Sequence, residues 1–237
     1  MKWRLLALTA SVALAGCNSD NPQNAAGHGR ADAVAPRKDT VKGKERNILA
    51  LGDSLLAGYG LNSGQGYPER LEAALRARGI NAQIVNAGIS GDTSAGGLQR
   101  LEFTLDNQPS PPELAIISLG GNDVLRGLPP EQTRTNLDAI VTALKSRGIK
   151  VVLLGMLAPP NLGADYRQAF DPIYPDLAKK HQAVLVPFFL QPVLAKPDLV
   201  QPDRIHPTAK GVEAMVAATL DSIVSALPRE ADAHAAR

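Results

Sequence analysis

Short apolar runs of β-rich composition alternate with amphipathic helical patterns along most of this chain, and this alternation restricts the fold more than any other feature. It is the signature of βαβ units, in which crossover helices join parallel strands. Runs such as LAIISL and KVVLLGM are apolar at nearly every position, which is typical of strands covered on both faces. The strand candidates are residues 47–51, 80–86, 114–119, 150–156 and 183–187. The sequence therefore predicts one α/β domain with a parallel sheet.

Helical patterns occupy the intervals between these runs. The pattern that ends at Gly148 places Leu137, Ile140, Val141 and Leu144 on one face, as expected for a helix packed on a core. Neither a GxGxxG nor a GxxxxGK[ST] loop follows any strand candidate, so a dinucleotide or P-loop site is not favoured. The helix candidates are residues 67–78, 131–147, 166–180 and 208–226.

The first residues read as an export signal. Residues 1–17 begin with the cations Lys2 and Arg4, continue with an apolar stretch and close on small residues. The stretch has about half of the roughly 20 residues that a membrane-spanning helix needs. The sequence therefore predicts a secretory signal rather than a permanent transmembrane anchor.

The end of this signal, Leu14-Ala15-Gly16-Cys17, resembles the lipobox of bacterial lipoproteins, in which the signal is cut before the cysteine and the thiol is lipidated. The resemblance implies an outer-membrane lipoprotein facing the periplasm, because Asn18 and not aspartate follows the cysteine. The alternative is a signal cut elsewhere, in which Cys17 is incidental. The expected organisation is a signal peptide (1–16), a lipidated cysteine with a flexible tether (17–45), a folded domain (46–228) and a disordered tail (229–237).

Charge and cysteine content exclude several classes of protein. The chain has 25 Lys and Arg against 23 Asp and Glu, and loss of Lys2 and Arg4 with the signal leaves a net charge of zero. A neutral protein has no overall field to hold a polyanion, so a nucleic-acid partner is not expected. The single cysteine cannot form an internal disulfide, and no CxxC motif or Cys/His cluster indicates zinc.

Polar residues collect directly after the strand candidates. In open parallel α/β sheets, ligands bind beyond the carboxyl ends of the strands. The segments at these positions are GDSL at 52–55, NAGISGDT at 86–93, GGND at 120–123 and DRIHP at 203–207.

A serine in such a loop becomes a nucleophile only with a base beside it, usually a histidine oriented by a carboxylate. Of the four histidines, only His206 lies in a loop after a strand; the others are His28, His181 and His234. Asp203 stands three residues before His206, and one turn brings its carboxylate to the imidazole. Ser54 is then the candidate nucleophile. Taken singly, each of the three is also a common turn or capping residue.

Acyl transfer also needs hydrogen-bond donors for the oxygen that becomes negative. Gly88 offers a backbone N–H and Asn122 a side-chain amide, although a tight turn and an Asx turn are the ordinary roles of these residues. A metal site is the other alternative, but no motif such as HExxH supports it. Its ligands would be Asp53, Asp123, Asp203 and His206.

In order along the chain, GDSL, Gly88, GGND and DRIHP resemble the four sequence blocks of the GDSL or SGNH hydrolases, and the match spans residues 47–207. The resemblance implies that Ser54 is the nucleophile and donates through its N–H, that Gly88 and Asn122 complete the oxyanion hole, and that His206 is the base oriented by Asp203. It also implies a three-layer α/β/α sandwich, flavodoxin-like, with five parallel strands ordered 2-1-3-4-5. Leu56 occupies the last glycine place of GxSxG, so the α/β-hydrolase nucleophile elbow is not present.

Within this family, GDSLLAGYG, NAGISGDTSAGGLQRL and LGGNDVLRG look most like the bacterial arylesterase, acyl-CoA thioesterase and lysophospholipase group. We therefore expect a monomeric serine esterase or thioesterase that hydrolyses fatty acyl or aryl esters through an acyl-enzyme, without metal or organic cofactor. Its partners would be a small-molecule or lipid ester and, through the anchor, a membrane. One alternative is a deacetylase of O-acetylated polysaccharide or peptidoglycan, because the same catalytic residues act on acetyl groups and only the shape of the pocket selects the acyl group. The other alternative is a non-catalytic binding lipoprotein.

Overall fold

A computed structural model of the chain describes residues 41–228. The expected signal peptide, the lipobox cysteine Cys17, nearly all of the tether and the C-terminal tail lie outside these residues. The segment expected to fold, 46–228, lies within them.

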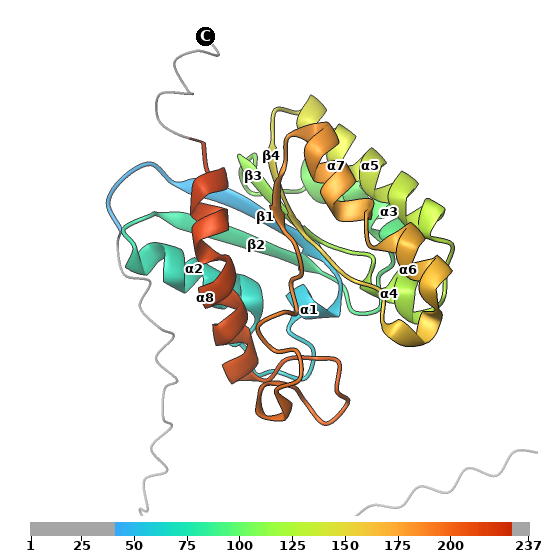
Figure 1. Cartoon of the computed structure of the whole chain (residues 1–237). Helices are drawn as coiled ribbons and strands as arrows, with labels where there is room; N and C mark the ends of the chain where they lie inside the picture. Colours follow the sequence, from blue (N-terminus) through green and yellow to red (C-terminus); the bar gives the residue numbers. More distant parts are fainter. Residues whose placement is uncertain (1–40, 229–237) are drawn as a thin grey trace, which may run out of the picture. The chain divides into compact units, whose positions relative to one another are not determined.

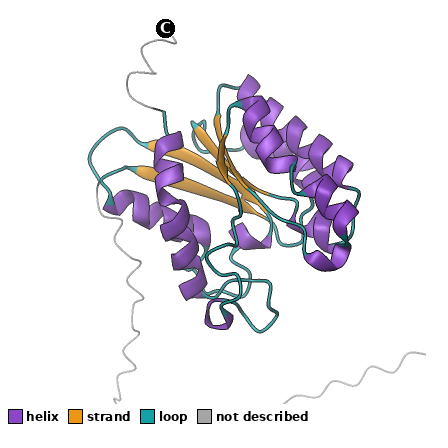
Figure 2. Ribbon diagram, in the orientation of Figure 1, coloured by secondary structure: helices purple, strands orange, loops and turns teal. Residues whose placement is uncertain are grey.

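Five parallel strands form one sheet in the order β2-β1-β3-β4-β5 (Figures 1 and 2). This confirms the predicted fold class and strand order. The order reverses between β1 and β3, which places the carboxyl ends of the central strands at a topological switch point. The strands are β1 Arg46–Gly52, β2 Ala82–Gly88, β3 Leu114–Ser118, β4 Lys150–Leu154 and β5 Val184–Val186.

Helices cover both faces of the sheet and make the other two layers. Figure 2 shows α2 and α8 on one face, and α3, α5, α6 and α7 on the other. The helices are α1 Ser54–Ala57, α2 Tyr67–Ala77, α3 Ser94–Asp106, α4 Gly121–Leu125, α5 Pro130–Ser146, α6 Ala164–Phe170, α7 Ile173–His181 and α8 Ala209–Ala226, with 3₁₀ turns η1 at Pro160–Leu162 and η2 at Pro197–Leu199. None of the helices within residues 41–228 has the length and apolar character needed to cross a bilayer.

Two helical expectations were wrong. The single helix predicted over 166–180 is two helices, α6 and α7, because Pro172 between them has no N–H for the helical ladder. The helix α3 was not predicted, since Gly96 and Gly97 in its first turns are poor helix formers. Thr93 caps this helix by accepting the Gly96 N–H, and a Cβ on Gly97 would lie 2.3 Å from Cδ1 of Leu119. The second glycine is therefore required by close packing on the end of β3.

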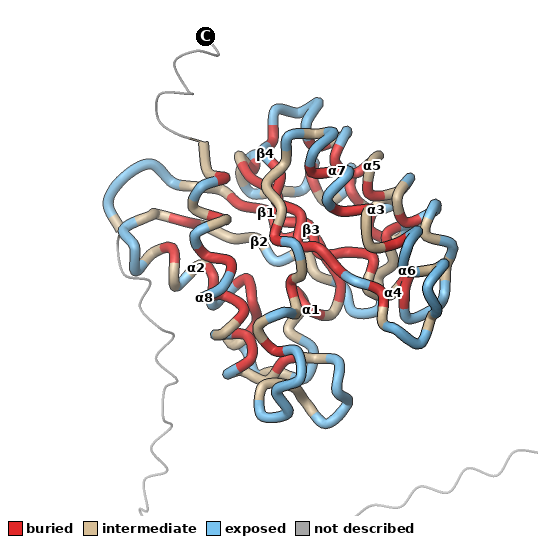
Figure 3. The backbone as a smooth tube through the Cα atoms, in the orientation of Figure 1, coloured by how far each residue is buried: buried red, intermediate tan, exposed pale blue. Residues whose placement is uncertain are grey.

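The core confirms the predicted burial. Every residue of β3 is buried, and β1 and β4 are buried apart from their first residues, as Figure 3 shows. The predicted inner face of α5, formed by Leu137, Ile140, Val141 and Leu144, is fully buried. By the area rule, each such leucine or isoleucine stabilises the fold by about 1.5–3 kcal/mol. A rigid sheet of this kind fixes the positions of the loops at its carboxyl edge.

Candidate active site

Ser54 is the first residue of α1 and follows β1 after a sharp turn. A Cβ on Gly52 would lie 2.7 Å from the carbonyl oxygen of Ser118, so only glycine lets β1 end this close to β3. Asp53 then caps α1, because its Oδ1 accepts the Leu55 N–H at 3.0 Å. The turn leaves Ser54 half-buried at the carboxyl edge of the sheet.

The structure brings together the three residues of the predicted relay. Nε2 of His206 lies 2.8 Å from Oγ of Ser54, and Nδ1 of His206 lies 2.6 Å from Oδ2 of Asp203. With the imidazole proton on Nδ1 and directed at the carboxylate, the lone pair of Nε2 faces the serine hydroxyl. The arrangement is able to remove the hydroxyl proton during nucleophilic attack.

One turn closes the spacing between Asp203 and His206, as predicted. Oδ1 of Asp203 accepts the backbone N–H groups of Ile205 at 2.9 Å and of His206 at 3.0 Å. The hydrogen bond from the His206 ring, together with these backbone bonds, lowers the pKa of Asp203 to about 2. The carboxylate is therefore ionised at neutral pH and able to stabilise a positive imidazole.

Two residues that the sequence analysis did not single out hold the histidine loop. The ring of Tyr59 lies on the imidazole of His206, with 4.5 Å between ring centroids. Nε2 of Gln201 donates to the carbonyl oxygens of Tyr59 at 2.8 Å and Pro207 at 2.9 Å. Tyr59 lies within the GDSLLAGYG block and Gln201 precedes DRIHP, but the sequence assigned neither a role, because both act through contacts between segments distant in the sequence.

Asn122 lies in α4 and lines the same cavity as Ser54. Its Nδ2 donates to the carbonyl oxygen of Asp92 at 2.8 Å and is 3.4 Å from Oδ2 of Asp53. Asp92 is in turn fixed by an ion pair with Arg100 at 2.7 Å. One amide hydrogen is thus held by Asp92. The other makes only the long contact with Asp53, so it is the one that a substrate oxygen in the shared cavity could take over.

Gly88 does not present the free N–H that the sequence analysis expected. Its N–H donates to Oδ1 of Asn86 at 2.9 Å, and a Cβ at this position would lie 2.4 Å from the amide nitrogen of Ala57. Gly88 is thus a packing residue where β2 meets α1. The side chain of an asparagine often accepts the backbone N–H two residues later, in an Asx turn. The position of Asn86 before Gly88 therefore already indicated this hydrogen bond in the sequence.

Gly91, in the same loop, is a better candidate for an amide donor. It has φ +86, a conformation that favours glycine, and its N–H has no hydrogen-bond acceptor within residues 41–228. Nη2 of Arg126 donates to its carbonyl oxygen at 2.7 Å. The next residue, Asp92, contacts Asn122, so the Gly91 amide belongs to the loop that lies beside the predicted amide donor.

Two buried carboxyl groups lie under the site. Asp53 is almost fully buried, and this burial raises its pKa to about 6. Asp123 accepts the backbone N–H of Ser94 at 2.8 Å and the hydroxyl of Thr133 at 3.0 Å, which ties α4 to α3 and α5. Within residues 41–228, no three His, Cys, Asp or Glu side chains are grouped as metal ligands would be.

A cavity of about 490 Å³ opens from Ser54 and Asn122. This volume lies in the usual range of small-molecule sites. Most of its wall is apolar, from Leu55, Val124, Leu125, Met156, Leu157, Ala158, Pro159, Pro160, Phe188, Leu190, Leu194 and Ile205.

Comparisons with known proteins agree with this geometry. The model of the GDSL-like lipase/acylhydrolase family matches residues 50–214. The chain is 42% identical over 168 residues to esterase TesA of Pseudomonas aeruginosa, covering 71% of this chain and 83% of that protein. It is 41% identical over 160 residues to thioesterase 1/protease 1/lysophospholipase L1 of Escherichia coli K12, covering 68% and 74%. The crystal structure of AlinE4, an SGNH-hydrolase family esterase, covers 79% of this chain and 100% of its own, with 59% identity and a TM-score of 0.67.

Proposed function

Because this chain belongs to the GDSL-like lipase/acylhydrolase family and is a serine hydrolase of carboxylic esters, we propose that it cleaves fatty acyl or aryl esters through an acyl-enzyme formed on Ser54. The observation that carries this proposal is the Ser54 hydroxyl, which meets the His206 ring at 2.8 Å and lies in the wall of the large apolar cavity. The reacting atom and a site for an apolar group are thus adjacent.

In the first half of the reaction, Nε2 of His206 accepts the proton of Ser54 as Oγ attacks the ester carbonyl. Asp203, ionised because its pKa is lowered to about 2, stabilises the resulting imidazolium. The imidazolium then gives its proton to the departing alcohol, and the acyl group stays on Ser54. In the second half a water molecule gives a proton to Nε2 of His206 and its oxygen attacks the acyl carbonyl. The bond between the acyl carbon and Oγ then breaks, His206 returns the proton to Oγ of Ser54, and the acid leaves. A thioester offers the same carbonyl carbon, so the same steps apply to it.

The negative oxygen of each tetrahedral intermediate needs donors that are in place before the reaction. We assign the side-chain amide of Asn122 and the backbone N–H of Ser54 to this role, as the sequence indicated. The third donor is the N–H of Gly91 in place of that of Gly88, because Asn86 already accepts the Gly88 N–H.

The size of the cavity favours a fatty acyl or aryl group over acetyl. A deacetylase gains nothing from an apolar volume of about 490 Å³, whereas each buried methylene of a longer chain contributes about 0.8 kcal/mol. The cavity volume thus disfavours the deacetylase, and the hydrogen-bonded Ser54, His206 and Asp203 disfavour a non-catalytic binding protein.

A series of p-nitrophenyl esters from acetate to dodecanoate tests the proposal. We expect kcat/KM to rise by at least about tenfold from acetate to octanoate, since burial of only two of the added methylenes, at about 0.8 kcal/mol each, already amounts to about fifteenfold. Replacing Leu157→Trp narrows the cavity and should lower kcat/KM for the longer esters more than for acetate. The matched control is Phe103→Trp, on α3 outside the cavity wall, which should leave the series unchanged. A series that peaks at acetate would favour the deacetylase.

The proposal also includes the location of the protein. The lipobox-like Leu14-Ala15-Gly16-Cys17 supports lipidation at Cys17, and Asn18 after it supports an outer-membrane lipoprotein that faces the periplasm. There the substrates would be lysophospholipids or exogenous esters and not cytosolic acyl-CoA. The variant Cys17→Ser should no longer incorporate radiolabelled palmitate or fractionate as a processed membrane protein. A wild-type protein without lipid would contradict the anchor.

A further inference from the structure

Exposed large apolar side chains gather at the carboxyl edge of the sheet. The described residues expose seven of them: Tyr59, Ile89, Phe103, Leu125, Leu157, Leu194 and Ile205. Leu125, Leu157, Leu194 and Ile205 all line the cavity at Ser54. The ring of Tyr59 contacts that of His206 at a tilt of 37°, and the N–H of Ile89 donates to the carbonyl oxygen of Gly52 beside the same site. Phe103 on α3 lies outside this group.

The four cavity residues come from four separate segments. Leu125 ends α4, Leu157 follows β4, Leu194 lies between β5 and η2, and Ile205 precedes α8. Their side chains are 61%, 44%, 55% and 42% exposed, respectively. A single exposed leucine needs no explanation, but a group around one opening marks an interaction surface.

Positive charge accompanies these apolar side chains. Arg167 and Arg204 line the cavity, and Lys196 and Arg204 line an adjoining hollow of about 460 Å³. The carboxyl group among the lining residues is that of Asp53, which is buried. Asp198 lies near Lys196, whereas the side chain of Arg204 has neither an ion pair nor a hydrogen bond within residues 41–228. Arg204 is therefore available to an external anion.

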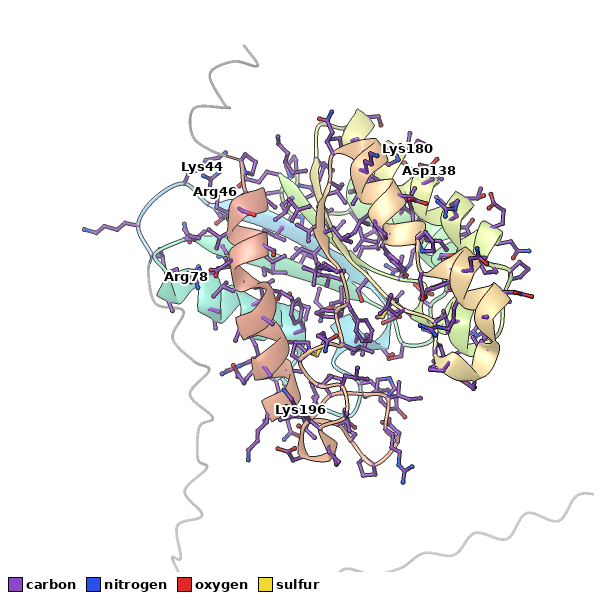
Figure 4. The ribbon with its side chains drawn as sticks, in the orientation of Figure 1. Lys44, Arg46, Arg78, Asp138, Lys180 and Lys196 are labelled. Atoms are coloured by element: carbon purple, nitrogen blue, oxygen red, sulfur yellow. The ribbon has the colours of Figure 1, made fainter. Side chains whose placement is uncertain are left out.

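Figure 4 places Lys196 in the loop at the lower end of the view, beyond the carboxyl ends of the strands, and Lys44 and Arg46 near the opposite end of the sheet. Those two cations are paired with Glu113 at 2.9 and 3.0 Å. On the cavity side Arg167 also has a carboxylate partner, Asp171 at 3.7 Å. Arg204 thus differs from these paired cations, because within residues 41–228 no carboxylate neutralises it.

We propose that the rim, defined as Leu125, Leu157, Leu194, Ile205 and Arg204, docks the protein on the surface of an anionic phospholipid assembly. Apolar side chains entering the boundary between headgroups and acyl chains, with cations at the phosphates, are what peripheral lipid binding requires. Docking turns the mouth of the cavity toward the lipid, so an acyl chain reaches Ser54 without crossing bulk water. This benefit rests on the proposed function, whereas docking itself needs no catalysis.

Tryptophan reporters test the docking directly. The full chain contains one tryptophan, Trp3, so a Trp3→Phe, Ser54→Ala parent has none and does not consume lipid. Leu125→Trp in this parent places the reporter on the rim, and Phe103→Trp places it on the matched exposed site of α3. On vesicles of phosphatidylcholine with phosphatidylglycerol, we expect the rim reporter to shift to shorter emission wavelength and to be quenched by brominated lipid. The Phe103→Trp reporter should do neither, even if an N-terminal anchor holds both proteins on the vesicle.

The charge is tested by Arg204→Met in the Leu125→Trp protein. Removal of one cation near an anionic surface should weaken partitioning to these vesicles by about fivefold and leave binding to pure phosphatidylcholine unchanged. A rim reporter that keeps its aqueous emission on anionic vesicles, or equal quenching at both sites, would overturn the proposal. So would a blue shift without vesicles that grows with protein concentration, because the rim would then contact a second copy. None of these readouts depends on ester hydrolysis, so failure here is distinct from failure of the proposed function.

Discussion

Nε2 of His206 lies 2.8 Å from Oγ of Ser54, although 152 positions separate the two residues in the chain. The contact joins the end of β1 to the loop before α8. It exists because both segments reach the carboxyl edge of one sheet, where Gly52 lets the chain turn and Asp203 holds the imidazole.

The chain has a second histidine–carboxylate pair, which supplies a control for the first. Nε2 of His181 lies 2.6 Å from Oδ1 of Asp138, and Figure 4 shows Asp138 beside Lys180 at the end of the molecule away from Lys196. We expect His206→Ala to lower kcat for a p-nitrophenyl ester by at least about a hundredfold, because base and acid steps share this ring. His181→Ala should leave kcat close to wild type. A larger loss of kcat in His181→Ala than in His206→Ala would identify His181 as the base.

Asn122→Ala separates an oxyanion donor from a turn residue. Loss of one such donor typically lowers kcat by about a hundred- to a thousandfold with little change in KM, because the bond matters most in the transition state. We expect this pattern together with a melting temperature near that of wild type. Steady-state kinetics and calorimetry on the same preparation check it. Activity that falls only in proportion to the folded fraction would make Asn122 a structural residue.

Asp53→Asn should change the pH dependence of stability. Burial raises the pKa of Asp53 to about 6, so the native state holds this proton more tightly than the unfolded state. The stability that this carboxyl contributes is full below about pH 4 and is lost as the pH rises through about 6. Asparagine has no such loss. Relative to wild type, the variant should therefore gain about 1–3 kcal/mol of unfolding free energy between pH 4 and pH 8, measured by urea denaturation.

Asp203→Asn should change the pH dependence of the unfolding free energy in the opposite direction to Asp53→Asn. Its pKa is lowered to about 2 by the His206 hydrogen bond, so its contribution is present above about pH 4 and is lost as the pH falls through about 2. The variant should lose stability relative to wild type at neutral pH and approach it in acid. Equal pH profiles for the two variants would contradict the assigned electrostatics.

The sheet was predictable because its signals are local. Runs of apolar residues bounded by turn residues located all five strands, although β2 begins at Ala82 and not at residue 80. Glycines explain the main error in the helices. Gly96 and Gly97 weaken the helical pattern of α3, yet Gly97 packs where a Cβ would meet Leu119, and such a tertiary reason is invisible to propensity.

The site was predictable to the extent that its residues occur in motifs. Ser54, Asp203 and His206 meet as predicted, and Asn122 lies beside them. The choice between glycines was not settled by the motif, because it depends on which N–H finds an internal acceptor. The role of Tyr59 was not found either, since contact between its ring and the His206 imidazole joins segments far apart in the sequence and has no characteristic spacing.

Labelling with a fluorophosphonate tests the central claim most directly, because such reagents react with a serine that an adjacent base activates. We predict one adduct per chain, located by mass spectrometry on the peptide that contains Ser54, with loss of esterase activity in the same proportion. Ser54→Ala should take no label and hydrolyse no ester while keeping the wild-type circular dichroism spectrum, and His206→Ala should be labelled far more slowly. An adduct on another residue, or full ester hydrolysis by Ser54→Ala, would contradict the assignment of Ser54 as the nucleophile.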